Sequence, residues 1–548
     1  MKQLYISVGI FFLSHSYAQK VSWQKDVESG TQDFLSGLAV TIDGQYLVSG
    51  SSIQKNQNPT GGNSQNKGYD YHILKLDQQG QKVWDRYFGG SKHDYLMSSI
   101  ATQEGGFALI GTSFSNISGD KKENNLGGSD VWLVRLNENG EELWQKTLGT
   151  KSNDEASTVV QSTDQGFFVA GNISDNRKLF GSKDVFISKL DKDGKLKQTT
   201  ILGGKSQDEV TDMIPTEDGG AVLLIYSTSG KSENRNNSET ANTSQSGNNQ
   251  NAPINQELTA LVKTFIGKTD ENFGSGDYWI VKLNKAGNVE WQKTYGGSGD
   301  DRPKSIAFTE NGYLIAGESR SNSSGNKKEN VKVGTDIWIL SLDKSGNEIW
   351  QKNYSFGNRD IVMSLDRIKE QRDKNKEATK GFLLGGYTQA EEKVKKDDEK
   401  FWMLYIDING KEEWRKYVEG KAKKNEERLV SAKLQNDGSY LLAGTSAEQL
   451  GEENWKVVKL LDSDVENLLE NKDLRIYPNP VTDYAYVEIG LEFQSADIYV
   501  YDMAGKLIQQ LQTSNKVTKI NTSKLPQGVY IISATTGNKK LTTKIVKN

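Results

Sequence analysis

Residues Asp277 to Gly317 read DYWIVKLNKAGNVEWQKTYGGSGDDRPKSIAFTENGYLIAG, and this stretch contains both halves of a unit that repeats along the chain. In the first half, an alternating apolar run is followed by Asn284, then Gly287 and Trp291. In the second half, an apolar run reaches an Asn-Gly turn, and a second run ends at Ala316-Gly317. Alternation with a period of two, broken by glycine turns, is typical of strands paired in hairpins. Each unit therefore predicts two hairpins, or four short antiparallel strands.

The first half of the unit occurs six times, with starts at Asp70, Asp130, Asp184, Asp277, Asp336 and Lys400. Five copies place a tryptophan fourteen residues after the start, at Trp84, Trp144, Trp291, Trp350 and Trp414, whereas the Asp184 copy has Gln198 there. All 11 tryptophans of the chain lie in the repeat. A residue that recurs with every unit indicates packing between units and not a cofactor site.

The second half of the unit occurs seven times, with turns near Asp43, Glu104, Asp164, Asp218, Asn311, Lys380 and Asp437. Four strands in each unit is the size of a β-propeller blade. The seventh unit lacks its fourth strand, but an isolated Val21-Ser-Trp-Gln-Lys25 near the N-terminus matches Trp144-Gln-Lys. We therefore expect an all-β fold with a seven-bladed propeller whose N-terminal strand closes the last blade and removes the exposed edge.

Composition narrows the possible chemistry. The 548 residues include no cysteine, which excludes disulfides, thiolate metal sites and cysteine nucleophiles. Three histidines leave little room for histidine-based catalysis. A net charge of −4, from 68 basic and 72 acidic residues, does not suggest a nucleic-acid partner.

The first 18 residues have the pattern of an export signal. Lys2 is followed by a short apolar run from Leu4 to Leu13 and by the small-x-small site Ser16-Tyr17-Ala18. The run is too short to span a bilayer, and we expect the mature chain to begin at Gln19.

The composition changes again from Leu474 onward, to alternating β-runs broken by Asn-Pro and Asp-x-x-Gly turns, which predict a small Ig-like β-sandwich. The segment contains Tyr477-Pro-Asn-Pro480, Asp502-Met-Ala-Gly-Lys506, Leu525-Pro-Gln-Gly-Val-Tyr530 and Lys544-Ile-Val-Lys547. In this order the motifs resemble the type A C-terminal sorting domain of cargo of the bacterial type IX secretion system. The resemblance implies passage through the periplasm to the cell surface or the medium, with the secretion machinery as partner. The repeats themselves, as in Tyr295-Gly-Gly-Ser-Gly-Asp-Asp301, resemble bacterial propeller repeats of unassigned function.

These observations divide the chain into a signal peptide at 1–18, a propeller at 19–462, a linker at 463–473 and a sorting domain at 474–548. Residues 228–256, rich in Ser, Asn, Gln and Thr, are expected to form a disordered insert in the propeller.

Loops of variable length are expected to gather on one face of the propeller, because the other face carries only tight turns. On the variable face an acidic residue recurs in every blade, at Asp33, Asp94, Asp154, Asp208, Asp301, Asp360 and Glu427. Seven carboxylates around the channel mouth could bind a cation or a polyol. The alternative, which we favour because the residue repeats with the blade, is that each carboxylate caps a local turn.

The Asp/Asn-x-x-Gly segments at Asp77, Asn137, Asp191, Asn284, Asp343 and Asp407 lack the later ligands of an EF-hand and are interpreted as hairpin turns. No catalytic, cofactor or metal constellation is recognised. We expect a non-enzymatic binding or adhesion protein, or a scaffold in a surface complex, with a surface polysaccharide or an outer-membrane protein as its partner. A propeller enzyme acting on extracellular glycans, a lyase or hydrolase, is the alternative, and a quinone-dependent dehydrogenase is the weaker one.

Overall fold

The computed structural model describes residues 20–27, 33–53, 68–174, 180–234, 262–373, 376–389, 400–417, 426–435, 438–447, 454–468, 474–491, 493–537 and 539–548. Within these ranges the chain is almost entirely β-strand, arranged in many small sheets, with one short helix. The all-β class expected from the repeat is therefore confirmed. The signal segment and most of the Ser/Asn-rich insert lie outside the described residues.

Seven sheets of four strands follow one another along the described chain, and one of them has an additional fifth strand. We number them by their order in the sequence. Sheet 1 contains β2 (Phe34–Val40), β3 (Tyr46–Ser52), β4 (Asp70–Leu76) and β5 (Lys82–Phe88), and sheet 2 contains β6 (Asp94–Ala101), β7 (Phe107–Ser113), β8 (Asp130–Leu136) and β9 (Glu142–Leu148). Sheet 3 contains β10 (Asn153–Gln161), β11 (Phe167–Ser174), β12 (Asp184–Leu190), β13 (Leu196–Gly203) and the additional strand β16 (Val262–Gly267). Sheet 4 contains β14 (Asp208–Pro215), β15 (Ala221–Ser227), β17 (Asp277–Leu283) and β18 (Val289–Tyr295). Sheet 5 contains β19 (Asp301–Phe308), β20 (Gly312–Ser319), β21 (Asp336–Asp343) and β22 (Glu348–Tyr354). Sheet 6 contains β23 (Arg359–Asp373), β24 (Lys376–Gln389), β25 (Lys400–Asp407) and β26 (Glu412–Tyr417). Sheet 7 contains β27 (Glu426–Leu434), β28 (Tyr440–Ala447), β29 (Asn454–Leu461) and the N-terminal strand β1 (Lys20–Val27).

The N-terminal strand β1 completes sheet 7, as expected from its match to the fourth strand of other units. It pairs antiparallel with β29, from Lys20 opposite Leu461 to Val27 opposite Trp455. The edge of β29 is thereby covered by a strand from the other end of the chain.

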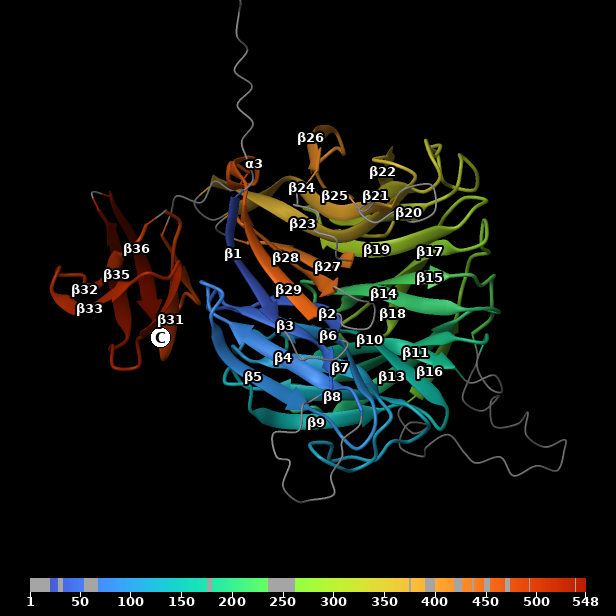
Figure 1. Cartoon of the computed structure of the whole chain (residues 1–548), viewed down its shortest axis with the longest axis horizontal. Helices are drawn as coiled ribbons and strands as arrows, with labels where there is room; N and C mark the ends of the chain where they lie inside the picture. The colour runs from blue at the N-terminus through green and yellow to red at the C-terminus, as the bar shows by residue number, and fades with distance from the viewer. Residues whose placement is uncertain are drawn as a thin grey trace, which may run out of the picture.

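The seven sheets are connected through their first strands. Each first strand contacts the first strand of the next sheet, and β27 contacts β2, so the contacts form a closed cycle (Figure 1). Second and third strands such as β7 and β8 are completely buried, and their side chains form the apolar layers between neighbouring sheets. In the described part of the chain, successive sheets are joined by isolated backbone bridges, such as Ser129 with Asn153, and not by a continuous ladder, so apolar packing holds most of each sheet against the next.

The recurring tryptophans lie in these layers, as predicted. The indole of Trp291 in sheet 4 donates to the carbonyl of Lys344 in sheet 5, at 3.2 Å, and its ring covers Gly346. Gly346 has a φ of +79°, and a Cβ there would lie 2.7 Å from the ring. In the copy that lacks tryptophan, Gln198 occupies the equivalent position against Gly287.

Two elements depart from the expected pattern. The repeat predicts four strands in each unit, but β16, which follows the predicted insert at 228–256, adds a fifth strand to sheet 3 by pairing parallel with the outer edge of β13. The predicted linker at 463–473 contains the helix α3 (Ser463–Glu466), which is capped by Asp462 and holds Val465 and Leu468 in an apolar cluster with sheets 6 and 7.

Two further sheets form the C-terminal part of the described chain. They contain β30 (Leu474–Tyr477), β31 (Tyr484–Ile489) and β34 (Val517–Asn521) in one sheet, and β32 (Ala496–Asp502), β33 (Leu507–Thr513), β35 (Gly528–Thr536) and β36 (Lys539–Lys547) in the other. Side chains from both sheets form one apolar cluster between them. Figure 1 shows this part beside the strands of sheet 1.

Candidate functional site

The tight turns between strands lie together at one end of the sheets, which we call the turn face. Each Asp/Asn-x-x-Gly turn is held by its first side chain. In Asp77, for example, Oδ1 accepts the backbone N–H groups of Gln79 at 2.9 Å and Gln81 at 2.7 Å. The same pattern occurs at Asn137, Asp191, Asn284, Asp343 and Asp407. The interpretation of these segments as hairpin turns is confirmed.

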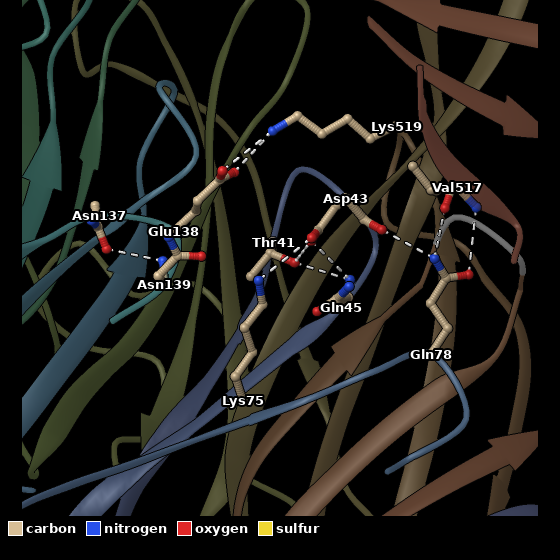
Figure 2. Close-up of polar contacts among 10 residues, drawn as sticks. All are labelled: Thr41, Asp43, Gln45, Lys75, Gln78, Asn137, Glu138, Asn139, Val517 and Lys519. Carbon is tan, nitrogen blue, oxygen red and sulfur yellow. Dashed lines mark hydrogen bonds and ion pairs between the residues drawn. The ribbon is translucent and has the colours of Figure 1, made fainter. Parts of the chain in front are cut away.

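The C-terminal sheets contact the turn face. In Figure 2 the amide of Gln78 lies against the backbone of Val517, and its nitrogen donates to the Val517 carbonyl at 3.0 Å and to the Asp43 carbonyl at 3.0 Å. Lys519 forms an ion pair of 3.1 Å with Glu138 at a neighbouring turn. These contacts do not involve the opposite end of the sheets, which we call the loop face.

The seven predicted acidic residues all lie at the loop face, at or next to the start of a first strand. In five of the seven, one carboxylate oxygen accepts the N–H of the residue four positions earlier, as in the 2.7 Å bond from Gly204 to Asp208. The other four residues with this bond are Asp94, Asp154, Asp301 and Asp360. In three sheets a serine hydroxyl from the following loop donates to the same oxygen, at 2.9, 2.9 and 2.8 Å from Ser115, Ser229 and Ser321. Asp33 is buried directly before β2, and Glu427 lies in β27 with its side chain outside the described part.

These contacts are the ones expected if each carboxylate caps a local turn. Burial raises the pKa of Asp208, although the hydrogen bonds from Ser227, Gly204 and Ser229 partly offset this effect. Among the residues that the structure describes, no group of three or more histidines, aspartates or glutamates is placed to hold a metal ion. Turn capping is the interpretation favoured from the sequence, and cation binding by the ring stays the untested alternative. Ser229 also belongs to the predicted insert at 228–256, so the start of that segment has a structural role.

The structure shows a second set of buried carboxylates, which the sequence pattern alone does not predict as a site. They begin the third strands, at Asp70, Asp130, Asp184, Asp277 and Asp336. Burial raises the pKa of Asp277 to about 7, and its carboxylate accepts the N–H of Phe273 at 2.6 Å. The buried Lys268 interacts electrostatically with Asp208 and Asp277, and burial lowers its pKa to about 8. Lys121 and Lys327 occupy the same place in sheets 2 and 5. The role of these groups is to fix the loops on the strands.

A charged pocket of about 490 Å³ lies at the loop face between sheets 5 and 6. It is lined by the start of β19, the end of β20 and the start of β23, together with adjoining residues. The lining residues are Asp300, Arg302, Lys304, Glu318, Arg320, Thr335, Arg359, Ile361, Met363 and Tyr387. The sequence pattern predicts no catalytic or binding role for any of them.

Two guanidinium groups in this pocket are held in place. Arg302 bonds through Nε to Asp300 at 2.9 Å and through a terminal nitrogen to the Tyr226 hydroxyl at 3.2 Å. The Arg320 Nε donates to the Thr335 hydroxyl at 3.0 Å. Glu318 is buried opposite Lys304, with 3.7 Å between Oε1 and Nζ, and burial raises its pKa. The pocket thus presents oriented cations with one buried carboxyl group.

An exposed aromatic cluster lies on the loop face at sheets 1 and 2. Phe34 and Tyr95 stand at the starts of β2 and β6, and Tyr69, His93 and Phe114 come from the adjoining loops. Ring centroids lie 5.0 Å apart for Phe34 and Tyr69 and 5.5 Å apart for His93 and Tyr95. Phe34 and Phe114 are 42% and 38% exposed. Aromatic rings in this arrangement offer faces on which a flat apolar group can stack.

Residues 475–548 match the model of a family described as the secretion system C-terminal sorting domain. This chain therefore carries a type IX sorting domain and is cargo of that system. As cargo it is exported to the cell surface or secreted, and its sorting domain interacts with the type IX machinery. In the described part of the chain, no helix has the length and apolar character needed to cross a membrane.

No curated protein matches the chain. Solved structures with a similar arrangement include the polysaccharide lyase Uly1, at 8% identity and a TM-score of 0.41, covering 81% of this chain and 99% of that one. A subtype N10 neuraminidase-like protein of A/little yellow-shouldered bat/Guatemala/060/2010 is 8% identical with a TM-score of 0.30, covering 60% and 85%. PorZ, a surface component of the type IX secretion system of Porphyromonas gingivalis, is 11% identical with a TM-score of 0.15, covering 95% and 82%. These scores are too low to carry an argument about function.

Proposed function

We propose that the seven sheets are the blades of a β-propeller spanning residues 19–462, closed by β1. The four strands of each sheet and the closed cycle of first-strand contacts support this architecture. The two C-terminal sheets, with a shared apolar cluster, would then be the Ig-like sandwich of a sorting domain at 474–548, after a connection at 463–473 and behind a signal peptide at 1–18.

We further propose that the protein is a non-enzymatic binding or adhesion protein, displayed on the cell surface or released, and that it binds its ligand at the loop face. A scaffold role in a surface complex would use the same face. The observation that carries this proposal is the charged pocket between sheets 5 and 6, which lies at the end of the sheets opposite to the contacts of the sorting domain. Pockets with a few convergent polar groups are the usual place of ligand recognition.

Binding of the purified, labelled full chain to glycan arrays and to whole cells tests this function. We expect saturable binding to at least one polysaccharide, protein or cell surface. The absence of binding to any of them, by a protein shown to be folded, would contradict the proposal.

An enzyme acting on extracellular glycans is the second candidate, since the same pocket contains Glu318. A buried carboxyl group with a raised pKa is suited to donate a proton to a leaving group. The binding proposal predicts no release of reducing ends or unsaturated products from polysaccharides incubated with the protein. Product release that is lost in the Glu318→Gln variant would replace the binding proposal with the enzymatic one.

A further inference from the structure

We propose that the pocket between sheets 5 and 6 binds the acid groups of an anionic polysaccharide, carboxylate or sulfate, through Arg302, Lys304, Arg320 and Arg359. This inference rests on the proposed binding function and specifies its ligand.

The charge of the pocket lining is opposite in sign to that of the chain. Its four cations face two carboxylates, Asp300 and Glu318, which leaves an excess of two positive charges when both are ionised. The whole chain has a net charge of −4. A local cationic site on an acidic protein attracts an anion specifically, without a general affinity for polyanions.

The cations are also oriented before a ligand arrives. The bonds of Arg302 to Asp300 and Tyr226, and that of Arg320 to Thr335, hold each guanidinium in one position. The Arg302 guanidinium carbon lies 4.4 Å from the centroid of the Tyr226 ring, which restricts it further. An arginine has five N–H donors in a planar fork, so one that is already positioned can bind two oxygens of a carboxylate or sulfate at little entropic cost.

The pocket breaks the symmetry of the repeat. Arg302 and Lys304 are the second and fourth residues of β19, and the corresponding residues of β6 are Tyr95 and Met97. Residues that only stabilise the repeat recur in every unit, as the capping aspartates do. β27 has Arg428 at the position of Arg302 but Val430 at the position of Lys304, so the pair of cations occurs in β19 alone among the first strands and is better explained by a ligand than by the fold.

The ligand class follows from where the protein goes and from the second feature of the loop face. The chain is exported, so polysaccharides of cell surfaces and of the medium are available to it. The exposed cluster of Phe34, Tyr95 and Phe114 can stack against sugar rings on the same face. An acidic polymer could contact both the cluster and the pocket. A nucleic acid is less suited, since it is read by extended basic surfaces, and the cations here are confined to one pocket.

The test measures binding of the full chain to polygalacturonate, dextran sulfate, neutral dextran and single-stranded DNA by isothermal titration calorimetry. We expect binding to polygalacturonate, dextran sulfate or both, weakening with added salt, and no binding to dextran or DNA. Preference for one of the two polyanions assigns carboxylate or sulfate as the bound group. The variants Arg302→Gln and Arg320→Gln should each weaken this binding by about tenfold or more, the loss expected for one charge-assisted hydrogen bond.

Lys122→Gln is the matched control. Lys122 lies in the loop between β7 and β8, is paired with Glu142 at the start of β9 and is far along the repeat from the pocket, so its loss should change the dissociation constant less than twofold. If an arginine variant does not fold, Lys304→Gln replaces it as the pocket variant, because the Lys304 side chain is partly exposed. Equal affinity of pocket variants and wild type, or tighter binding of DNA, would overturn the inference. If the wild type binds neutral glycans or cells and the pocket variants bind them equally well, the inference about the pocket is wrong but the binding function stands. If the wild type binds nothing, both the inference and the binding function are wrong.

Discussion

At the scale of single residues, the same side chain type has different roles in different places of the repeat. Aspartates at the starts of first and third strands are buried and accept backbone N–H groups, whereas Asp300 is in the pocket and orients Arg302. The capping role could be predicted from the sequence, since it recurs with the unit. The pocket could not be predicted in the same way, because its lining comes from separate segments between Asp300 and Tyr387 and includes residues that deviate from the repeat. Comparing the copies position by position would have revealed Lys304, and its combination with Arg302, as a deviation, since the seventh unit has Arg428 at the position of Arg302 but Val430 at that of Lys304.

Replacement of Asp208 tests the capping role. Asp208→Ala should lower the free energy of unfolding by about 0.5–2 kcal/mol, because the N–H of Gly204 and the hydroxyl of Ser229 lose their acceptor. Asp208→Asn should be milder, since its amide oxygen can still accept the N–H bond. Urea denaturation of the three proteins measures both effects. If calcium instead raises the wild-type melting temperature, and the Asp94, Asp154 and Asp208 to Asn triple variant loses this effect, the ring is a cation site.

Two turn glycines, one packed against a recurring tryptophan and one against the glutamine that replaces it, allow a matched comparison. Gly346→Ala and Gly287→Ala both place a Cβ at a residue with positive φ, +79° and +87°, which costs about 1–2 kcal/mol in each case. At Gly346 the new Cβ also meets the rigid ring of Trp291, whereas at Gly287 it meets the end of the flexible Gln198 side chain. Gly346→Ala should therefore be more destabilising by a further ~1–3 kcal/mol. Equal losses in urea denaturation would mean that the tryptophan does not pack as described.

At the scale of elements, the hairpins could be predicted because each strand pair is encoded locally, by alternation and a glycine turn. The pairing of β1 with β29 could be predicted as well, since the seventh unit lacks a fourth strand and Val21–Lys25 has no partner nearby. The strand β16 and the helix α3 could not. β16 depends on an open edge of β13 far away in the sequence, and α3 depends on apolar contacts of Val465 with neighbouring sheets.

Removal of residues 21–26 tests the closure by β1. This deletion uncovers the edge of β29 and removes Trp23, whose indole donates to the carbonyl of Gln78 and covers Gly80 in sheet 1. The lost burial is worth on the order of several kcal/mol, so the melting temperature should fall markedly. Deletion of residues 235–256 is the control, because shortening a long connection changes its closure entropy by less than about 1 kcal/mol. Similar melting temperatures for the two deletions would contradict the closure.

At the scale of the whole molecule, the two ends of the sheets have separate uses. The turn face contacts the sorting domain through Gln78 and Glu138, and the loop face carries the pocket and the aromatic cluster. This separation follows from the order of strands in each sheet, because loops of variable length can only lie opposite the tight turns. Binding at the loop face is thus compatible with a sorting domain that remains attached.

Deletion of residues 474–548 tests the assignment of export to this segment. The remaining seven-sheet body has its own apolar layers, so we expect a folded protein that accumulates in the periplasm. Cell fractionation and surface labelling of intact cells measure its location. Normal amounts of the truncated protein at the surface would show that the signal for export lies elsewhere.

Ligand binding at the loop face is tested most directly by hydrogen exchange of the full chain with and without bound polygalacturonate, followed by mass spectrometry of its peptides. We expect slower exchange in peptides covering residues 300–304, 318–320 and 359–363, with further protection around Tyr95, and no change in the turns at 41–45 and 77–81. Protection confined to the turn face or to the sorting domain, with the pocket peptides unchanged, would contradict binding at the loop face.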